Sequence, residues 1–236
     1  MTPAYDADFY ADRGQATRHA ADSLLSVVAE HIAFSRVADV GCGTGTWLAA
    51  AMQLGAQQAF GYEGEWVNGV PLDDGRIALT LIDLEQPLVG EQVDLVLSLE
   101  VAEHLSPSRA DGFVADLCAM GSAILFSAAI PGQGGVNHRN EQWQSYWARK
   151  FAARGFAAFD VVRPLVWSDD SIPAWYRQNA VLYVSEAREP RLDANPVSDL
   201  GTLDLVHPAL WNRANRELEY ANAMPESLYL QASDAR

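Results

Sequence analysis

The stretch DVGCGTGTW (residues 39–47) decides the fold, because it places Gly41, Gly43 and Gly45 between an apolar run and a helical pattern. RVADVG predicts a short strand, and TWLAAAMQLG predicts a helix closed by a glycine. Glycines in such a turn let backbone amides and a helix N-terminus approach a ligand. A dinucleotide site expects G-x-G-x-x-G/A, but the last of these positions is Thr46 here. The turn therefore predicts a cofactor site whose spacing departs from the dinucleotide pattern.

Strand and helix patterns alternate along the rest of the chain. The predicted strands cover residues 36–41, 58–63, 76–84, 94–101, 122–129, 156–162 and 179–186. The predicted helices cover residues 17–33, 46–55, 107–118, 140–154 and 208–223. Ser106 is the predicted N-cap of the third helix, and Asn140 with Glu141 is expected to begin the fourth. We therefore expect an α/β fold with a doubly wound, mostly parallel sheet covered by helices on both faces.

The chain is expected to form one domain with an appendage. The domain covers residues 1–186, and a C-terminal extension covers residues 187–236 with one helical stretch. This helix is expected either to dock on the domain or to pack on a second subunit as part of a homo-oligomer. Tyr5, Phe9 and Tyr10 in the N-terminal helical segment are candidates for a lid over the substrate.

Composition limits the partners of the protein. Thirty-one acidic residues against sixteen basic ones give a formal charge of −15, so the average field repels phosphate backbones and anionic lipids. The sequence shows no apolar run long enough to span a bilayer and no signal-peptide pattern at its start. Two cysteines fit a reducing compartment. We expect a cytoplasmic protein with a small-molecule substrate, no nucleic-acid partner and no membrane association.

The pattern D-x-G-x-G-x-G resembles the first motif of class I S-adenosylmethionine-dependent methyltransferases, and the likeness continues over residues 37–127. The resemblance implies a seven-stranded sheet whose last strand is antiparallel. It implies that Asp39 holds the methionine end of the cofactor, that Glu63 accepts hydrogen bonds from the ribose, and that Asp83 meets the adenine. The full set of cofactor-binding residues that it implies is Asp39, Gly41, Cys42, Gly43, Gly45, Glu63, Asp83, Leu84 and Leu99.

The pentapeptide EVAEH (residues 100–104) puts Glu100, Glu103 and His104 at the predicted end of the fourth strand. Ligands bind at the carboxyl ends of the strands in open α/β sheets, so these side chains should face the methyl acceptor. Two carboxylates and an imidazole offer ligands suited to Mg²⁺, Mn²⁺ or a related divalent ion. A second imidazole, His138, follows the fifth predicted strand.

Together with His138, this pentapeptide resembles the metal site of the small-RNA 2′-hydroxyl methyltransferases, and its first part resembles the ubiquinone-pathway O-methyltransferases. The resemblance implies a metal site made of Glu100, Glu103, His104 and His138, and catalytic roles for Glu103, His104 and His138. The acidic net charge and the shorter gap between the pentapeptide and His138 differ from the RNA enzymes, so we do not expect an RNA substrate. Without a metal, His104 or His138 is the candidate general base, and a histidine here can also be only a polar wall.

Aromatic residues and two further histidines lie outside these motifs. The aromatic residues are Trp143, Tyr146, Trp147, Trp167, Trp175 and Tyr176. Such a stripe is more often core, and the alternative is a wall for a sugar ring or planar metabolite. His19 and His207 have no partner that the sequence identifies, and we assign them no role.

The leading hypothesis from the sequence is an O-methyltransferase that uses S-adenosylmethionine on a small hydroxylated metabolite, natural product or saccharide, with help from a divalent metal. Three alternatives stay open. The first is metal-free methylation of an amine, and the second is a non-catalytic module that binds the cofactor. The third is an NAD-linked oxidoreductase, which Thr46 disfavours.

Overall fold

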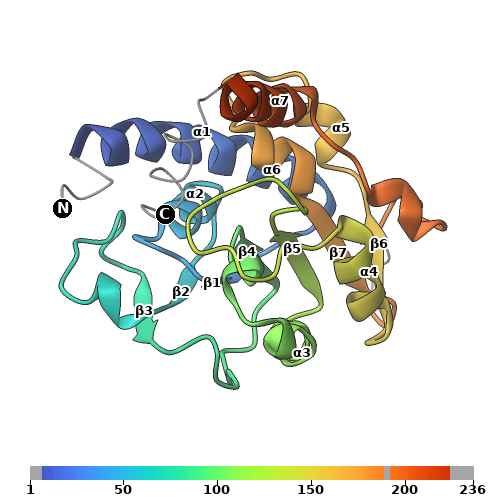
Figure 1. Ribbon diagram of the computed structural model, residues 1–236. Coiled ribbons are helices and arrows are strands. Elements are labelled where there is room, and N and C mark those ends of the chain that lie inside the picture. Colours follow the sequence, from blue (N-terminus) through green and yellow to red (C-terminus); the bar gives the residue numbers. More distant parts are fainter. Residues whose placement is uncertain (1–6, 189–191, 224–236) are drawn as a thin grey trace.

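The computed structural model of the protein describes residues 7–188 and 192–223. Its centre is a seven-stranded sheet in the order β3-β2-β1-β4-β5-β7-β6 (Figure 1). The strands are β1 (Arg36–Val40), β2 (Gln58–Glu63), β3 (Ala78–Leu81), β4 (Leu95–Leu99), β5 (Ala123–Ser127), β6 (Phe156–Phe159) and β7 (Val181–Ser185). All pairs from β3 to β5 are parallel, and β7 is antiparallel to both of its neighbours. The predicted mostly parallel sheet with an antiparallel last strand is confirmed.

Helices cover both faces of the sheet. The longer helices are α1 (Ala7–His31), α2 (Thr46–Gln53), α3 (Ala110–Met120), α4 (Gln144–Ala152) and α7 (Pro208–Ala223). The shorter ones are η1 (Glu65–Val67), η2 (Ala102–His104), η3 (Pro107–Arg109), α5 (Arg163–Val166), α6 (Ala174–Asn179) and η4 (Leu200–Leu203). Helices α1, α2, α5 and α6 share one apolar core with the sheet, whereas α3 and α4 share the other (Figure 1). Helix α7 packs on α6.

Strand β4 shows how the sequence builds two cores at once. Its side chains alternate, so Leu95 and Leu97 pack with α1 and α2 while Val96 packs with α3 and α4. All three are fully buried, which explains why the strand reads as a continuous apolar run. On the α4 side, the rings of Phe151 and Tyr183 stack with centroids 4.0 Å apart. The sheet is therefore a rigid base for the residues at its carboxyl ends.

Several predicted boundaries are wrong, each for a local reason. The fourth helix begins at Gln144 rather than Asn140, because Asn140 donates its backbone N–H to the carbonyl of Glu103. Ser106 and Pro107 do occupy the predicted N-cap and first positions, of the short helix η3 that runs into α3, but the Ser106 hydroxyl donates to the carboxylate of Glu85 and makes no capping hydrogen bond. The third predicted strand shortens to Ala78–Leu81. Helix α6 lies where the sequence pattern predicts no helix.

The tail is docked over the part that the structure describes. Leu210 of α7 is buried, and Arg213 donates a hydrogen bond to the carbonyl of Gln133. The domain boundary after residue 186 and an oligomer through α7 stay predictions. In the N-terminal lid, Tyr5 lies outside the described residues, so the lid also stays a prediction. No helix in residues 7–188 and 192–223 combines the length and apolarity needed to cross a membrane.

Candidate functional site

The turn after β1 needs its glycines for two different reasons. Gly41, Gly43 and Gly45 have φ values of 87°, 54° and 90°, in the left-handed region that favours glycine. A Cβ on Gly41 would lie 2.3 Å from Val101 Cγ2, and one on Gly45 would lie 2.5 Å from a side-chain carbon of Ile77. A Cβ on Gly43 would meet nothing within 4 Å. The outer glycines therefore serve packing, whereas Gly43 leaves open space beside its backbone.

Glu63 at the end of β2 lies against this turn, as the resemblance implies. Its Oε2 accepts the backbone N–H of Gly43 at 2.8 Å. Its Oε1 accepts the backbone N–H of Gly64 at 2.8 Å and the indole N–H of Trp66 at 3.0 Å. A carboxylate has about four acceptor positions, so one remains free and the exposed indole is exchangeable. Glu63 can thus bind a polyhydroxylated group and still hold the turn.

Asp39 is a buried acid without an obvious structural use. Its side chain is 1% exposed, and Oδ2 has no hydrogen-bond partner among the described residues. Burial first, and then the nearby charge of Glu63, raise the pKa of Asp39 well above its usual value. An unpaired buried carboxyl is costly unless a ligand supplies a donor or a positive charge. The ammonium group of an amino-acid cofactor would supply both.

The other cofactor residues implied by the resemblance divide into two groups. Cys42 and Leu99 are buried near the turn and the end of β4, and burial raises the pKa of the Cys42 thiol. Asp83 is exposed, and its carboxylate accepts the backbone N–H of Glu85 at 3.0 Å. Leu84 is half-buried. Ile82 extends the β2–β3 pairing by donating its N–H to the Glu63 carbonyl at 2.8 Å, so Asp83 and Leu84 follow directly at the same sheet edge.

Glu100 follows β4 in a strained backbone conformation. Its φ of 57° is unusual for a residue with a side chain, and such strain is concentrated at functional sites. Its Oε1 accepts the amide of Asn179 and its Oε2 accepts the amide of Gln133, both at 3.1 Å. Burial raises the pKa of Glu100, while these hydrogen bonds oppose the shift. Two side-chain amides that belong to none of the sequence motifs therefore fix this carboxyl group.

Glu103, His104 and His138 come together at the carboxyl end of β4. One ligand atom from each lies within 4.8 Å of the others. Glu103 is fully buried, and neither carboxylate oxygen has a partner in the part of the chain that the structure describes. Burial first, and then the charge of Glu100, raise the pKa of Glu103 well above its usual value. An orphaned buried carboxylate beside two imidazoles fits a divalent cation.

The separation of these ligand atoms is close to what an ion requires. Two ligands at about 2.1 Å from Mg²⁺ can be at most about 4.2 Å apart. The observed limit of 4.8 Å exceeds this span by about 0.6 Å, which small side-chain rotations can close. Glu100 lies beside this group, but both of its oxygens already accept amide hydrogen bonds.

The two imidazoles differ in their surroundings. Their rings meet edge to face with centroids 4.8 Å apart. Nδ1 of His138 lies 2.8 Å from Oε1 of Glu141, so a proton on Nδ1 leaves Nε2 as the ligand atom. His138 also packs on Gly135, where any Cβ would overlap the ring. Burial first, and then the charge of His138, lower the pKa of His104, which is exposed to the pocket.

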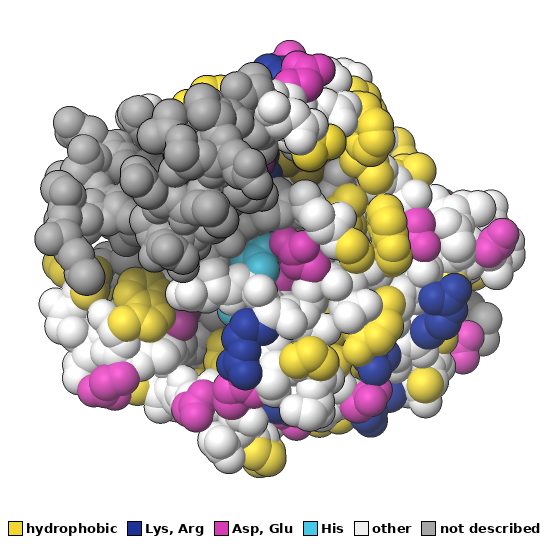
Figure 2. Space-filling model, in the orientation of Figure 1, with side chains coloured by type: hydrophobic (Ala, Val, Ile, Leu, Met, Phe, Trp, Pro, Cys, Tyr) yellow, Lys and Arg dark blue, Asp and Glu magenta, His cyan; other side chains and the backbone are white. Residues whose placement is uncertain are grey.

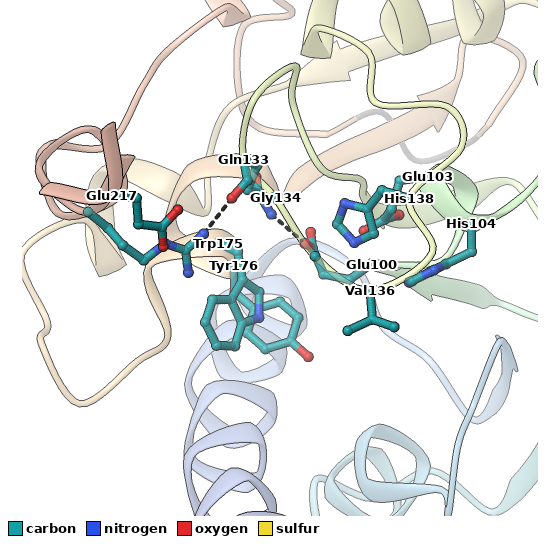
Figure 3. A pocket seen from close by; sticks show the side chains of 12 residues that line it. Glu100, Glu103, His104, Gln133, Gly134, Val136, His138, Trp175, Tyr176 and Glu217 are labelled. Atoms are coloured by element: carbon teal, nitrogen blue, oxygen red, sulfur yellow. Dashed lines mark hydrogen bonds and ion pairs between the residues drawn. The ribbon is translucent and has the colours of Figure 1, made fainter. Parts of the chain in front are cut away.

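These residues line a pocket of about 560 Å³. Histidine and acidic side chains gather near the middle of the face shown in Figure 2. In Figure 3, His104 and Glu217 lie on opposite sides of this pocket, with Trp175 and Tyr176 between them. The sequence pattern did not identify Gln133, Arg213 and Glu217 as pocket residues. A single polar residue on a helix or loop forms no recognisable motif, so only the fold shows that these three residues line the pocket.

The remaining aromatic and histidine residues have mostly structural positions. Trp147 is buried in the core, and Trp143 is 39% exposed. His207 has the partners that the sequence could not identify: its Nε2 lies 2.9 Å from the carbonyl of Trp167, and Nδ1 accepts the N–H of Ala209 at 3.1 Å. His19 lies 3.6 Å from Asp169 in an exposed pair.

No protein-family model matches this chain, and no curated protein matches its sequence. Solved structures do match. Magnesium protoporphyrin IX methyltransferase from Synechocystis PCC 6803, with bound SAH, is 16% identical with a TM-score of 0.51, over 78% of this chain and 90% of that one. An O-methyltransferase family protein from Burkholderia thailandensis is 15% identical with a TM-score of 0.52, over 77% and 59%. A SAM-dependent methyltransferase from Archaeoglobus fulgidus is 19% identical with a TM-score of 0.50, over 65% and 76%. The fold is that of S-adenosylmethionine-dependent methyltransferases.

Proposed function

We propose that the protein is an S-adenosylmethionine-dependent O-methyltransferase that acts on a small hydroxylated molecule with the help of a divalent cation. One observation supports this proposal above the others. Two buried carboxyls, Asp39 and Glu103, have oxygens without a hydrogen-bond partner among the described residues. Asp39 lies in β1 next to the glycine turn, and Glu103 follows the neighbouring strand β4 next to two imidazoles. The first site fits an amino-acid nucleoside, and the second fits a metal beside the methyl acceptor.

The cofactor side of the proposal rests on three acceptors along one sheet edge. Asp39 would hold the ammonium group, Glu63 the ribose hydroxyls and Asp83 the adenine amino group. The absence of a side chain at Gly43 leaves space for the cofactor beside the turn. When bound, the cofactor supplies a methyl group on a positively charged sulfur, which becomes a neutral thioether once the methyl group has left.

On the acceptor side, the hydroxyl oxygen forms the new bond to carbon while the carbon–sulfur bond breaks, and the hydroxyl proton passes to solvent water. Glu103, His104 and His138 would hold a divalent ion, which lowers the pKa of a hydroxyl bound to it. Tyr176 is unsuited to take the proton, because burial raises its pKa to about 12. The main tasks of the pocket are then to orient the hydroxyl and to exclude water.

A metal-free variant of this function has one observation in its favour. His104 lines the pocket, and burial first and then the charge of His138 lower its pKa, so its neutral imidazole can accept a proton directly. In that case the acceptor could be an amine as well as a hydroxyl. Removal of divalent ions separates the two mechanisms, because only the metal-assisted one depends on them.

The test is methyl transfer from labelled S-adenosylmethionine to a panel of vicinal diols, catechols and amines. Each reaction is run with added Mg²⁺ or Mn²⁺ and with EDTA. The proposal predicts transfer to hydroxyl compounds that EDTA abolishes and added metal restores. Turnover that chelation leaves unchanged contradicts metal assistance, and transfer to amines alone contradicts O-methylation.

A further inference from the structure

From the far end of the pocket we infer that the methyl acceptor carries an anionic group, of the carboxylate type, that binds Arg213 of α7 while its hydroxyl lies at Glu103, His104 and His138. This inference rests on the proposed function, because it names the class of substrate for the same pocket. Arg213 belongs to the C-terminal extension, so it is part of neither the glycine turn nor the EVAEH pentapeptide.

Arg213 is the single Lys or Arg among the described residues that line the pocket. One of its terminal nitrogens, Nη2, donates to the carbonyl of Gln133, in the loop that also carries His138. This contact fixes the guanidinium relative to the metal-site loop. The contacts of Arg213 with described residues are through Nη2 and Nε, and the proposal assigns Nη1 to the ligand.

The charge of Arg213 is only weakly compensated by its neighbour. Glu217, four residues further along α7, lies 3.8 Å from its Nε, and the two side chains are 40% and 73% exposed. Exposed pairs at this spacing contribute little to stability, so a ligand can replace Glu217 at small cost. A carboxylate is the better partner, because it can accept two parallel hydrogen bonds from a guanidinium.

The walls between Arg213 and the two histidines suit a flat molecule. Trp175 and Tyr176 lie between Glu217 and His104 in the pocket (Figure 3). A volume of about 560 Å³ is in the range of small-molecule sites. An aromatic or sugar ring with a hydroxyl at one end and a carboxylate at the other would contact the metal site, the aromatic rings and Arg213 together.

The test compares three ligands that share a ring with vicinal hydroxyls: a dihydroxybenzoate, its neutral amide and the corresponding benzylamine. Their binding is measured by calorimetry with Mn²⁺ present, so the readout does not depend on turnover. Wild type is compared with Arg213→Gln, Arg213→Lys and the control Arg216→Gln. Arg216 is exposed on the same helix and does not line the pocket. Circular dichroism checks that α7 stays folded in each variant.

Wild type should bind the acid about tenfold or more tightly than the amide, as expected for a charge-assisted hydrogen bond. Arg213→Gln should remove this preference, Arg213→Lys should keep part of it, and Arg216→Gln should leave it unchanged. Equal binding of acid and amide, a preference for the amine, or no binding of any of the three overturns the inference. Methyl transfer measured alongside distinguishes the two proposals: acid-selective binding without any transfer contradicts the proposed function alone, whereas transfer without acid preference contradicts this inference alone.

Discussion

Gly43 donates its backbone N–H to the carboxylate of Glu63 across 2.8 Å, and this bond joins the turn after β1 to the end of β2. The two residues are 20 positions apart in sequence. Their contact shows that the glycine turn and the acid belong to one site. Because Oε1 of Glu63 is shared between a backbone amide and an exposed indole, the carboxylate is held in place before any ligand arrives. The cofactor proposal depends on this preorganisation.

Replacing Glu63 with Gln should weaken the binding of S-adenosylhomocysteine by about tenfold to a hundredfold, because hydrogen bonds to a charged acceptor contribute about 1.5–3 kcal/mol. Isothermal titration calorimetry measures the affinity directly. Glu65→Gln is the matched control, since Glu65 is an exposed acid two positions away that bonds only to Asn68 among the described residues. Equal affinities in wild type and Glu63→Gln would show that this carboxylate does not bind the ribose.

Gly41→Ala and Gly43→Ala should differ in their effects, although both residues have positive φ. The new methyl group at position 41 would overlap Val101, so we expect a loss of about 2–5 kcal/mol in the free energy of unfolding. The methyl group at position 43 meets no protein atom, so a loss of about 1–2 kcal/mol is expected, together with weaker S-adenosylhomocysteine binding.

Thermal unfolding and calorimetry on the same preparations measure both effects. Val101→Ala added to Gly41→Ala should restore part of the stability, because it removes the atoms that overlap. Similar stability losses for the two glycine variants, with unchanged cofactor affinity in both, would disagree with this interpretation of the turn.

The pattern of the sequence predicts local structure well and the site only in part. The strand over residues 58–63 and the helix over residues 208–223 have the predicted bounds, because each is a clear periodic run between turn signals. The order of the strands depends on pairings between distant segments, so periodicity does not predict it, and the resemblance implies only the seven strands and the antiparallel last strand. The short α6, rich in large polar and aromatic side chains, gave no periodic signal.

The candidate site shows the same division. Glu103 and His104 were visible because they are neighbours in the sequence, and His138 because a histidine in a glycine-rich loop is conspicuous. The amides of Asn179 and Gln133 were not visible, since their only signal is a hydrogen bond to Glu100 across 79 and 33 positions. The left-handed backbone of Glu100 is likewise set by its surroundings rather than by its residue type.

The stability of the metal-free protein should depend on pH through Glu103. Burial raises the pKa of this carboxyl, so the folded protein keeps a proton that the unfolded chain releases above the usual value of 4.5. Its contribution is therefore fully present below that value and is lost as the pH rises through the folded pKa. Glu103→Gln cannot ionise, so its stability relative to wild type should increase with pH.

Urea unfolding in EDTA at about pH 5 and about pH 8 measures this trend. The pKa of Asp39 is also raised by burial, so the unfolding free energy of the variant still depends on pH in part. Comparing wild type and variant at each pH cancels that shared contribution. A stability difference that stays constant between the two pH values would mean that Glu103 is not held protonated by the fold.

Glu141→Gln should weaken Mn²⁺ binding by about tenfold to a hundredfold, because partners that orient a ligating histidine contribute about that much to metal affinity. His138→Ala removes the ligand itself and should have a larger effect. His19→Ala is the control, since His19 lies in an exposed pair with Asp169, outside the pocket lining. Titration followed by electron paramagnetic resonance gives the affinities. Unaltered Mn²⁺ affinity in His138→Ala would contradict the proposed metal site.

The central claim is that the turn and the successive strand ends bind an S-adenosyl nucleoside. Calorimetric titration of the wild-type protein with S-adenosylhomocysteine, and separately with NAD⁺, tests this claim most directly. We predict saturable binding of S-adenosylhomocysteine at one site per chain and no binding of NAD⁺ under the same conditions. Binding of NAD⁺ in preference to S-adenosylhomocysteine, or of neither, would contradict the claim.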